Sequence, residues 1–150
     1  MDNVYILGGL RSYIGVINGM YRHVPAEKLG AAVLRQLLEK YPVEPDYVIC
    51  GNGVGAGGNI TRLMTLEAGL DNRVPAFTID VQCGSGLESI AVAAAKIACG
   101  DADVVIAGGF ESSSTQPRRG YNPNHPDYNG DSWYSVAKFM PDIHRETVML

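Results

Sequence analysis

Short apolar runs alternate with longer amphipathic stretches between Val4 and Phe110. Each apolar run ends at a glycine or a turn, which is typical of strands buried on both faces. The predicted strands are Val4–Leu7, Tyr47–Cys50, Val74–Val81 and Val104–Ala107. Between them, apolar residues recur at helical spacing in three stretches. The first stretch begins at Pro25, the second is Ile60–Leu70, and the third is Leu87–Ala98. The order β-α-β-α-β-α-β predicts an α/β fold in which helices cover a mixed, mainly parallel sheet.

Composition and charge narrow the class of protein. The chain has 150 residues and a formal net charge of −4, with acidic and basic residues interspersed. No basic cluster is large enough to indicate binding to nucleic acid, and no apolar run is long enough to cross a membrane. The cysteines, Cys50, Cys83 and Cys99, lack paired spacing, which argues against a disulfide framework and against a metal site. Because no basic and apolar leader follows Met1, we expect a cytoplasmic protein.

The regular periods disappear after Phe110. Prolines and aromatic residues are frequent instead: Pro117, Tyr121, Pro123, Pro126, Tyr128, Trp133, Tyr134 and Pro141. A segment of this length without secondary structure is unusual in a compact domain, and its aromatic content is too high for ordinary disorder. We therefore expect it to pack on residues outside this sequence, and we expect the chain to be the front part of a longer protein.

Cys83 lies at a sharp turn between a predicted strand and a predicted helix, and Gly84-Ser85-Gly86 follows it. Such a turn places the sulfur at the carboxyl edge of the sheet, where open α/β sheets bind ligands. Small neighbours leave the side chain exposed, as in a nucleophile elbow. Free N–H groups and the dipole at a helix start favour a thiolate and would stabilise an oxyanion. The local pattern fits a nucleophile and a small buried cysteine equally well.

Longer motifs around Cys83 resemble those of the thiolase family. The active-site segment of thiolases is similar to Val74–Ile79 followed by Cys83–Leu87. The thiolase GDAD and GG-x-ES motifs resemble the run Gly100–Ser112. Arg11–Gly15 sits where thiolases carry an R-T-P-x-G stretch. The resemblance covers nearly the whole stretch from residue 3 to residue 115 in unbroken order.

This resemblance implies a fold and a chemistry. Thiolases consist of two similar halves, each ending in one further strand, and an irregular loop domain that contacts coenzyme A is inserted into the first half. Residues 1–115 would then be an incomplete N-terminal half-domain, and residues 116–150 would begin the loop domain. Cys83 would be the catalytic nucleophile, forming an acyl-cysteine that transfers the acyl group between CoA thioesters. The reaction would be 3-ketoacyl-CoA thiolysis or Claisen condensation.

The resemblance also implies the partners of such a site. Coenzyme A and acyl-CoA would be substrates, with no permanently bound cofactor and no metal. The activating histidine and the second cysteine of thiolases belong to the C-terminal half, and none of His23, His125 and His144 lies in a matching motif. Cys50 and Cys99 are expected to be core residues. We therefore expect this chain alone to be inactive, and we expect a homo-oligomer such as a dimer, a complementary C-terminal half, or both.

Departures from the thiolase pattern keep other functions open. Asp80 stands where the family usually has Asn, Ser or Thr, and a nearby ionised carboxylate would disfavour a thiolate. Tyr13 and Ile14 replace the usual Thr-Pro, and Phe110 replaces a common Met. One alternative is a non-catalytic thiolase-like scaffold that binds acyl-CoA or a partner protein. Another is a condensing enzyme like the β-ketoacyl synthases.

Two further signals have both a structural and a functional interpretation. The loop Gly51–Gly58 lacks the G-x-G-x-x-G spacing of dinucleotide sites. In thiolases the matching segment lies near the dimer contact, which is the expected role of Asn52, Asn59 and Arg62. Glu111 follows the last predicted strand, where it would act in a site or, as we favour, tie neighbouring loops by hydrogen bonds.

Overall fold

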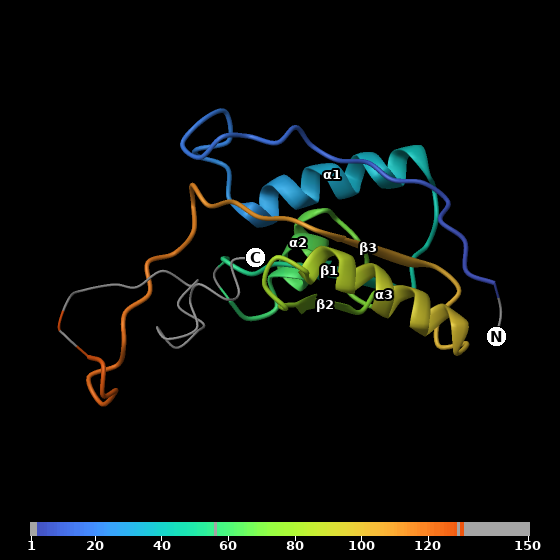
Figure 1. Ribbon diagram of the computed structural model, residues 1–150. Helices are drawn as coiled ribbons and strands as arrows, with labels where there is room; N and C mark the ends of the chain where they lie inside the picture. Colours follow the sequence, from blue (N-terminus) through green and yellow to red (C-terminus); the bar gives the residue numbers. More distant parts are fainter. Residues whose placement is uncertain (1–2, 56, 129, 131–150) are drawn as a thin grey trace. The chain divides into compact units, whose positions relative to one another are not determined.

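The computed structural model describes residues 3–55, 57–128 and 130 of the chain. The chain divides into two compact units, Met1–Gln116 and Pro117–Leu150. The helices and strands of the described residues belong to the first unit (Figure 1). In chain order they are α1 (Ala26–Lys40), β1 (Tyr47–Gly51), α2 (Ile60–Glu67), β2 (Ala76–Ile79), α3 (Ser85–Ala98) and β3 (Val105–Gly109). The predicted α/β fold class is confirmed.

The strand β1 lies at the centre of the sheet. Among the described residues the strands form one parallel sheet in the order β2-β1-β3. Val48 of β1 is paired with Ala76 of β2 and with Ile106 of β3. Val48 and Ile49 have no exposed surface, because a central strand is covered on both faces. The continuous apolar run of β1 therefore correctly predicts a buried parallel strand.

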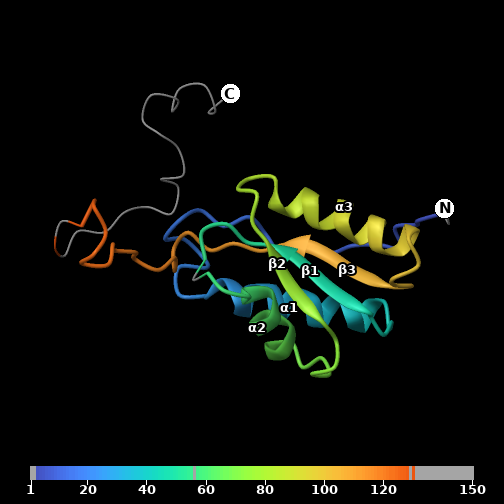
Figure 2. The ribbon, with the colours of Figure 1, turned by 90° about the horizontal axis from the view of Figure 1, so that it is seen from below.

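Helices cover both faces of the sheet, as Figure 2 shows: α3 lies on one face, and α1 and α2 lie on the other. The main core lies between α1, α2 and the sheet, and consists of Ala31, Leu34, Val48, Cys50, Met64, Ala68 and Ala76. Gly30 allows α1 to approach α2 closely, because a side-chain carbon there would lie 2.6 Å from the sulfur of Met64. The two helices thus form one layer over this face.

The sequence at the ends of α1 and α3 explains where these helices begin and end. α1 begins directly after Pro25, which is its N-cap residue and has a φ of −58° and a non-helical ψ of 149°. α3 is terminated at Gly100, which has a φ of 78°. The Gly100 N–H donates to the carbonyl of Ile97, and the Asp101 N–H donates to the carbonyl of Lys96. These two bonds form a Schellman motif, so the helix end predicted at Gly100 is confirmed.

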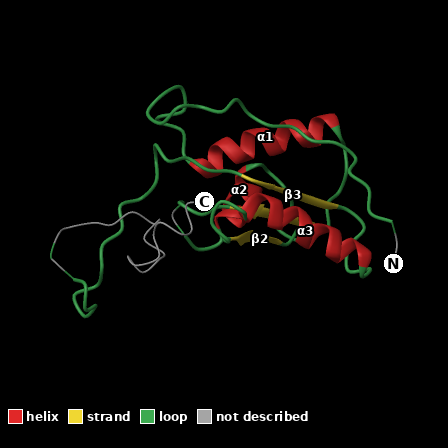
Figure 3. Ribbon diagram, viewed as in Figure 1, coloured by secondary structure: helices red, strands yellow, loops and turns green. Residues whose placement is uncertain are grey.

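The strand predicted at Val4–Leu7 is wrong, because the chain is irregular there (Figure 3). Tyr5, Ile6 and Leu7 are each at least 70% exposed. A strand forms only where a neighbour completes its hydrogen-bond ladder, and no strand of the described residues is paired with this segment. An apolar run alone does not reveal whether such a neighbour is present.

Several large apolar residues of α2 and α3 are exposed, although their helical spacing predicts that they are buried. Four large apolar residues are between 44% and 75% exposed, namely Leu63, Leu66, Leu87 and Ile90. The buried positions of the same helices include the hydroxyl residues Thr61, Thr65, Ser85 and Ser89. Their hydroxyl groups donate to nearby backbone carbonyls, which compensates for their burial. Short polar side chains, rather than leucines, therefore bring these helices close to the strands.

The second unit contains little regular structure in its described part. The rings of Tyr121 and His125 stack there with their centroids 3.9 Å apart. Trp133, Tyr134, Pro141 and His144 lie outside the described residues. The loop domain expected over residues 116–150 stays a prediction. Across the residues that the structure describes, no helix combines the length and hydropathy needed to span a membrane.

Candidate active site

The turn that carries Cys83 joins the end of β2 to the start of α3. Cys83 is exposed, and it lies at the carboxyl edge of the sheet, as the sequence predicts. The preceding residue, Gln82, has a φ of 59°. This left-handed conformation costs a residue with a side chain on the order of 1 kcal/mol. Other contacts must therefore hold the turn in place.

Side chains on both sides of Cys83 supply such contacts. Asp80 Oδ1 accepts a hydrogen bond from the Gln82 N–H at 3.0 Å. Ser85 Oγ accepts one from the Val81 N–H at 2.9 Å and donates to the Gln82 carbonyl at 2.6 Å. Ser85 is only 4% exposed. The backbone around Gln82 is thus held by two side chains as well as by its own turn.

The first turn of α3 packs directly against the end of β1. A side-chain carbon at Gly51 would lie 2.5 Å from the carbonyl carbon of Ser85 and 2.7 Å from the nitrogen of Gly86. Such separations are too short for real atoms, so only glycine fits there. At Gly109 the tightest contact of an added carbon would be 3.4 Å, which is an ordinary van der Waals distance. Gly51 therefore determines how close the helix start comes to the sheet.

An open cavity of about 360 Å³ lies beside Cys83. Its lining comes from the loop after β1, the Cys83 turn and the end of β3, over residues 51–54, 82, 83, 85, 86 and 109–111. The backbone N–H groups of Gly86 and Leu87 have no hydrogen-bond partner among the described residues. Together with the helix dipole, they favour negative charge near the start of α3. The site thus combines an accessible thiol with donors suited to an anion.

Glu111 fastens the glycine-rich loop to the end of β3. Its Oε1 accepts from the Asn52 amide at 3.0 Å, and its Oε2 accepts the N–H groups of Gly53 and Val54 at 2.8 and 2.9 Å. Asn52 is 7% exposed and also donates to the Phe110 carbonyl at 2.7 Å. Both carboxylate oxygens are therefore occupied by donors. This arrangement supports the structural interpretation of Glu111 over a role as a base.

Asn59 and Arg62 also make their hydrogen bonds within the chain. Asn59 caps α2 and donates to the Ala76 carbonyl at 2.7 Å. Arg62 donates to the carbonyls of Val74 and Asn72, both at 2.6 Å. The two side chains thus join α2 to β2 and to the residues that precede it. Their location near a dimer contact stays a prediction.

The other cysteines do not line the Cys83 cavity. Cys50 is 6% exposed, and burial raises the pKa of its thiol to about 12. Its prediction as a core residue is confirmed. The same prediction for Cys99 is wrong, because this residue lies exposed at the end of α3, where its thiol donates to the Lys96 carbonyl. The described residues around Cys83 include no histidine, so they offer no imidazole base for the thiol.

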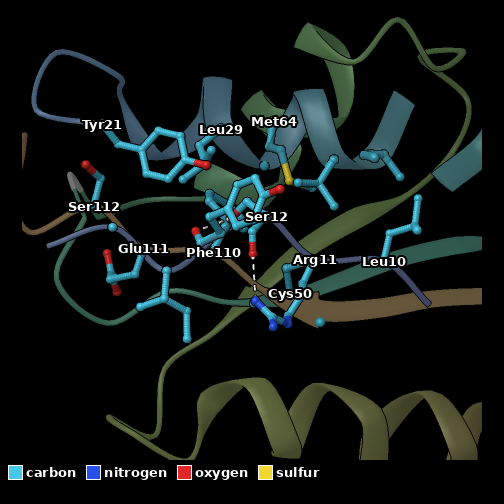
Figure 4. Close-up of a pocket in the computed structure, with 18 of the residues that line it drawn as sticks. Leu10, Arg11, Ser12, Tyr21, Leu29, Cys50, Met64, Phe110, Glu111 and Ser112 are labelled. Atoms are coloured by element: carbon cyan, nitrogen blue, oxygen red, sulfur yellow. Dashed lines mark hydrogen bonds between the residues drawn. The ribbon is translucent and has the colours of Figure 1, made fainter. Parts of the chain in front are cut away.

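A larger cavity, of about 400 Å³, lies between the irregular segment before α1 and the core (Figure 4). Arg11, Ser12, Leu29 and Met64 are among its lining residues. The Arg11–Gly15 stretch, which resembles a family motif, thus lies at this cavity and not at the one beside Cys83. The two cavities share residues 109–111, but Cys83 does not line the larger one.

The sequence predicts the position of Cys83 but not the residues that hold its turn. Ser85 and Ser89 are four residues apart, and hydroxyl groups at this spacing on a largely apolar helix are a signal for the buried face. Gly51 closes a buried strand, and such a glycine is a signal for close approach by another backbone. Neither signal identifies the partner, which is distant in the sequence.

The sequence matches a family model and is similar to proteins from other organisms. The family model described as "Thiolase, N-terminal domain" matches residues 4–149. The protein named "Putative acetyl-CoA C-acetyltransferase VraB" of Staphylococcus aureus (strain COL) is 40% identical over 148 residues, or 95% of this chain and 39% of that protein. "Putative acetyl-CoA C-acetyltransferase YhfS" of Bacillus subtilis (strain 168) is 40% identical over 143 residues, or 91% of this chain. The chain spans 39% of the length of each of these relatives.

Proposed function

The chain belongs to the thiolase family, whose N-terminal domain it matches, and we propose that the whole protein is an acyl-CoA acyltransferase with Cys83 as its nucleophile. The observation that carries this proposal is the exposed Cys83 thiol directly before α3, whose first N–H groups at Gly86 and Leu87 have no partner among the described residues. The names of the two relatives, both given as acetyl-CoA C-acetyltransferases, support a CoA thioester as the substrate.

In the proposed reaction Cys83 Sγ attacks the carbonyl carbon of an acyl-CoA thioester. A bond from Sγ to the acyl carbon forms, the bond to the CoA sulfur breaks, and CoA leaves as a thiol with the proton that Cys83 gave up. A second acyl-CoA then loses a proton from its α-carbon, and this carbon attacks the acyl-cysteine. The products are a 3-ketoacyl-CoA and the regenerated Cys83 thiol, which takes up the proton from the α-carbon. Thiolysis is the same sequence in reverse.

The start of α3 supplies the stabilisation that this chain can offer. The N–H groups of Gly86 and Leu87 and the helix dipole favour negative charge on Sγ and on the oxygen of a tetrahedral intermediate. Removal of one such donor costs other enzymes about 3 kcal/mol of transition-state stabilisation. The groups that carry protons to and from Cys83 belong, in this proposal, to the remainder of the protein. Residues 1–150 alone are therefore inactive, and neither a resident cofactor nor a metal takes part.

Mass spectrometry of the intact protein after incubation with acetyl-CoA tests the assignment. We expect an acetyl group on Cys83, complete loss of this label in Cys83→Ala, and an unchanged label in Cys99→Ala. Cys99→Ala is the matched control, because Cys99 is the other exposed cysteine. An unchanged yield of label in Cys83→Ala would overturn the proposal. Binding of acetyl-CoA without any acyl-enzyme would indicate a scaffold, and acylation only from a carrier protein would indicate a β-ketoacyl-synthase-like enzyme.

Association is the second part of the proposal. Leu87 and Ile90 form an apolar strip on the outer side of α3, where they are 75% and 44% exposed. We propose that a second copy, a C-terminal half, or both cover apolar surface of this kind in a cytoplasmic protein. Analytical ultracentrifugation of residues 1–150 should show self-association or poor folding. A stable, well-folded monomer at low concentration would contradict this expectation.

A further inference from the structure

Asp80 and Ser85 flank Cys83 and make hydrogen bonds that no step of the proposed reaction uses. We propose that both are positioning residues, which hold Gln82 in its left-handed conformation and thereby direct the Cys83 thiol into its cavity. This inference deepens the proposed function of Cys83. It concerns how the thiol is presented, so it is measurable by the reactivity of the thiol as well as by acyl transfer.

Ser85 is the first of the two. Its hydroxyl group bridges two peptide groups of the turn, accepting from the Val81 N–H at 2.9 Å and donating to the Gln82 carbonyl at 2.6 Å. The Ser85 N–H donates to the same Gln82 carbonyl at 3.1 Å. With 4% of its surface exposed, Ser85 has little access to water that would replace these bonds. The buried hydroxyl group and the backbone N–H of Ser85 therefore together orient the Gln82 carbonyl.

The position of Ser85 is itself fixed by the sheet. The backbone and side chain of Ser85 pack so closely on Gly51 that a side-chain carbon at Gly51 would lie 2.6 Å from Ser85 Cβ. Ser85 cannot move toward β1, so the hydroxyl group has a defined place relative to the strand. The rigid strand thus positions Ser85, and Ser85 positions the peptide that precedes Cys83.

Asp80 contacts Gln82 at its backbone N–H, whereas Ser85 contacts the Gln82 carbonyl. Its Oδ1 accepts the Gln82 N–H at 3.0 Å, so side chains engage both peptide groups of Gln82. Asn, Ser and Thr also offer a side-chain oxygen on a short side chain. The property that these four residue types share is the acceptor oxygen and not the charge. Asp80 thus fits the turn as a hydrogen-bond acceptor.

Gln82 is the residue on which both contacts act. Without the two side chains, a residue with a Cβ atom favours negative φ, and a change of φ at Gln82 would redirect the following Cys83. A glycine at this position adopts φ near 59° without strain. Replacement of Gln82 by Gly should therefore remove the need for the positioning side chains.

Competitive alkylation of the intact protein with iodoacetamide, read by mass spectrometry, tests the inference. The rate at Cys83 is divided by the rate at Cys99, which is also exposed and serves as a reference in the same molecule. We expect this ratio, and the rate of acylation by acetyl-CoA, to fall on the order of ten-fold in both Ser85→Ala and Asp80→Ala. Asp80→Asn, which keeps the acceptor oxygen, should restore both to within about two-fold of the wild-type values. Gln82→Gly should largely restore them in the Ser85→Ala background.

Three results would overturn the inference. The first is an unchanged alkylation ratio in Asp80→Ala. The second is an equal fall of the ratio in Asp80→Asn and Asp80→Ala, which would assign the effect to charge. The third is a ratio that does not recover when Gln82→Gly is added to Ser85→Ala. If Ser85→Ala fails to fold, the exposed Asp80 still provides the test through its Ala and Asn variants. An alkylation ratio that behaves as expected in a protein that never accepts an acyl group would reject the proposed function while retaining the inference.

Discussion

The two edges of the sheet carry similar side chains but differ in their free backbone groups. At the carboxyl edge, Cys83 lies exposed before α3, and Glu111 accepts hydrogen bonds from two backbone amides. At the amino edge, Cys99 lies exposed after α3, and Asp46 likewise accepts two backbone amides. A carboxylate at each edge thus ties a loop to the sheet, and a thiol lies at each end of one helix.

The difference lies in what the helix presents to each thiol. At the end of α3 the Schellman motif at Gly100 satisfies two of the last carbonyls, and the Cys99 thiol donates to the carbonyl of Lys96. At its start, the N–H groups of Gly86 and Leu87 remain unpaired among the described residues. Unpaired donors at a helix start favour an anion, whereas carbonyls at a helix end do not. The comparison teaches that unpaired amides, rather than exposure, distinguish the candidate nucleophile.

The largest effect is expected from Gly51→Ala, which would push the start of α3 away from β1. The added carbon would lie 2.5 Å from the Ser85 carbonyl carbon, and overpacking of this kind destabilises a protein by about 3 kcal/mol. Urea denaturation of the intact protein measures the loss in the free energy of unfolding. Gly109→Ala is the matched control, with a contact of 3.4 Å and an expected loss below about 1 kcal/mol. Equal losses would show that the helix start is not tightly packed.

The next largest effect is expected from Ser89→Ala, which cuts the link between α3 and β3. The Ser89 hydroxyl group lies 2.7 Å from the carbonyl oxygens of Gly108 and Gly86 and is completely buried. Its removal leaves a buried acceptor without that donor, which costs about 1.5 kcal/mol. The same denaturation experiment measures this loss, with the exposed Ser113→Ala as the control. A neutral Ser89→Ala would mean that packing alone holds α3 on β3.

A third prediction compares the two exposed thiols directly. Cys83 should react with iodoacetamide at pH 7 roughly ten times faster than Cys99, because Cys83 lines an open cavity whereas the Cys99 thiol donates to the Lys96 carbonyl. Mass spectrometry of each modified peptide gives both rates from one sample of the intact protein. The ratio should approach one after unfolding in urea, since the helix no longer exists. A ratio near one in the folded protein would remove the distinction between the two edges.

The smallest effect is expected at Asp46. Hydrogen bonds from the amides of Val104 and Asp103 hold the pKa of its carboxyl group below the usual 3.8. A lowered pKa in the folded state stabilises the protein above about pH 4, and this contribution is lost as the pH falls through the folded-state pKa. Asp46→Asn should therefore lower the urea midpoint slightly at pH 7, and the difference from wild type should shrink toward pH 3. A difference that is constant with pH would contradict the predicted linkage.

The order of elements was predictable because it depends on local signals. Continuous apolar runs identified β1, β2 and β3, and Pro25 and Gly100 marked helix ends through their own backbone geometry. The run Val4–Leu7 shows the limit of such signals, because it has strand composition but no paired neighbour among the described residues. A strand depends on a partner, whereas a helix end depends mainly on its own sequence.

The sequence predicted the position of Cys83 in the candidate site, but it did not predict the contacts that hold the surrounding residues. The position of Cys83 follows from its place between a strand and a helix. The contacts of Ser85 with Gly51 and of Ser89 with Gly108 join residues that lie far apart in the sequence. A hydrophobicity pattern also favours leucines as the inward residues, although in α2 and α3 hydroxyl groups occupy about half of the buried positions, and Ile60, Met64 and Ala93 occupy the others. Close packing of a helix on a sheet selects for small size before it selects for apolar character.

Because Cys50 is buried, the number of thiols that react rapidly distinguishes the folded protein from the unfolded one. A reagent that modifies accessible thiols should titrate Cys83 and Cys99 rapidly in the native protein, because the pKa of the Cys50 thiol is raised to about 12 and its surface is 6% exposed. Cys50 belongs to the core cluster between the sheet and the layer formed by α1 and α2, and it lines the larger cavity, so its thiol should become fully accessible when the core opens. A pulse of such a reagent during denaturation would therefore follow the opening of the core with no added label, while Cys83 reports in the same sample on the site.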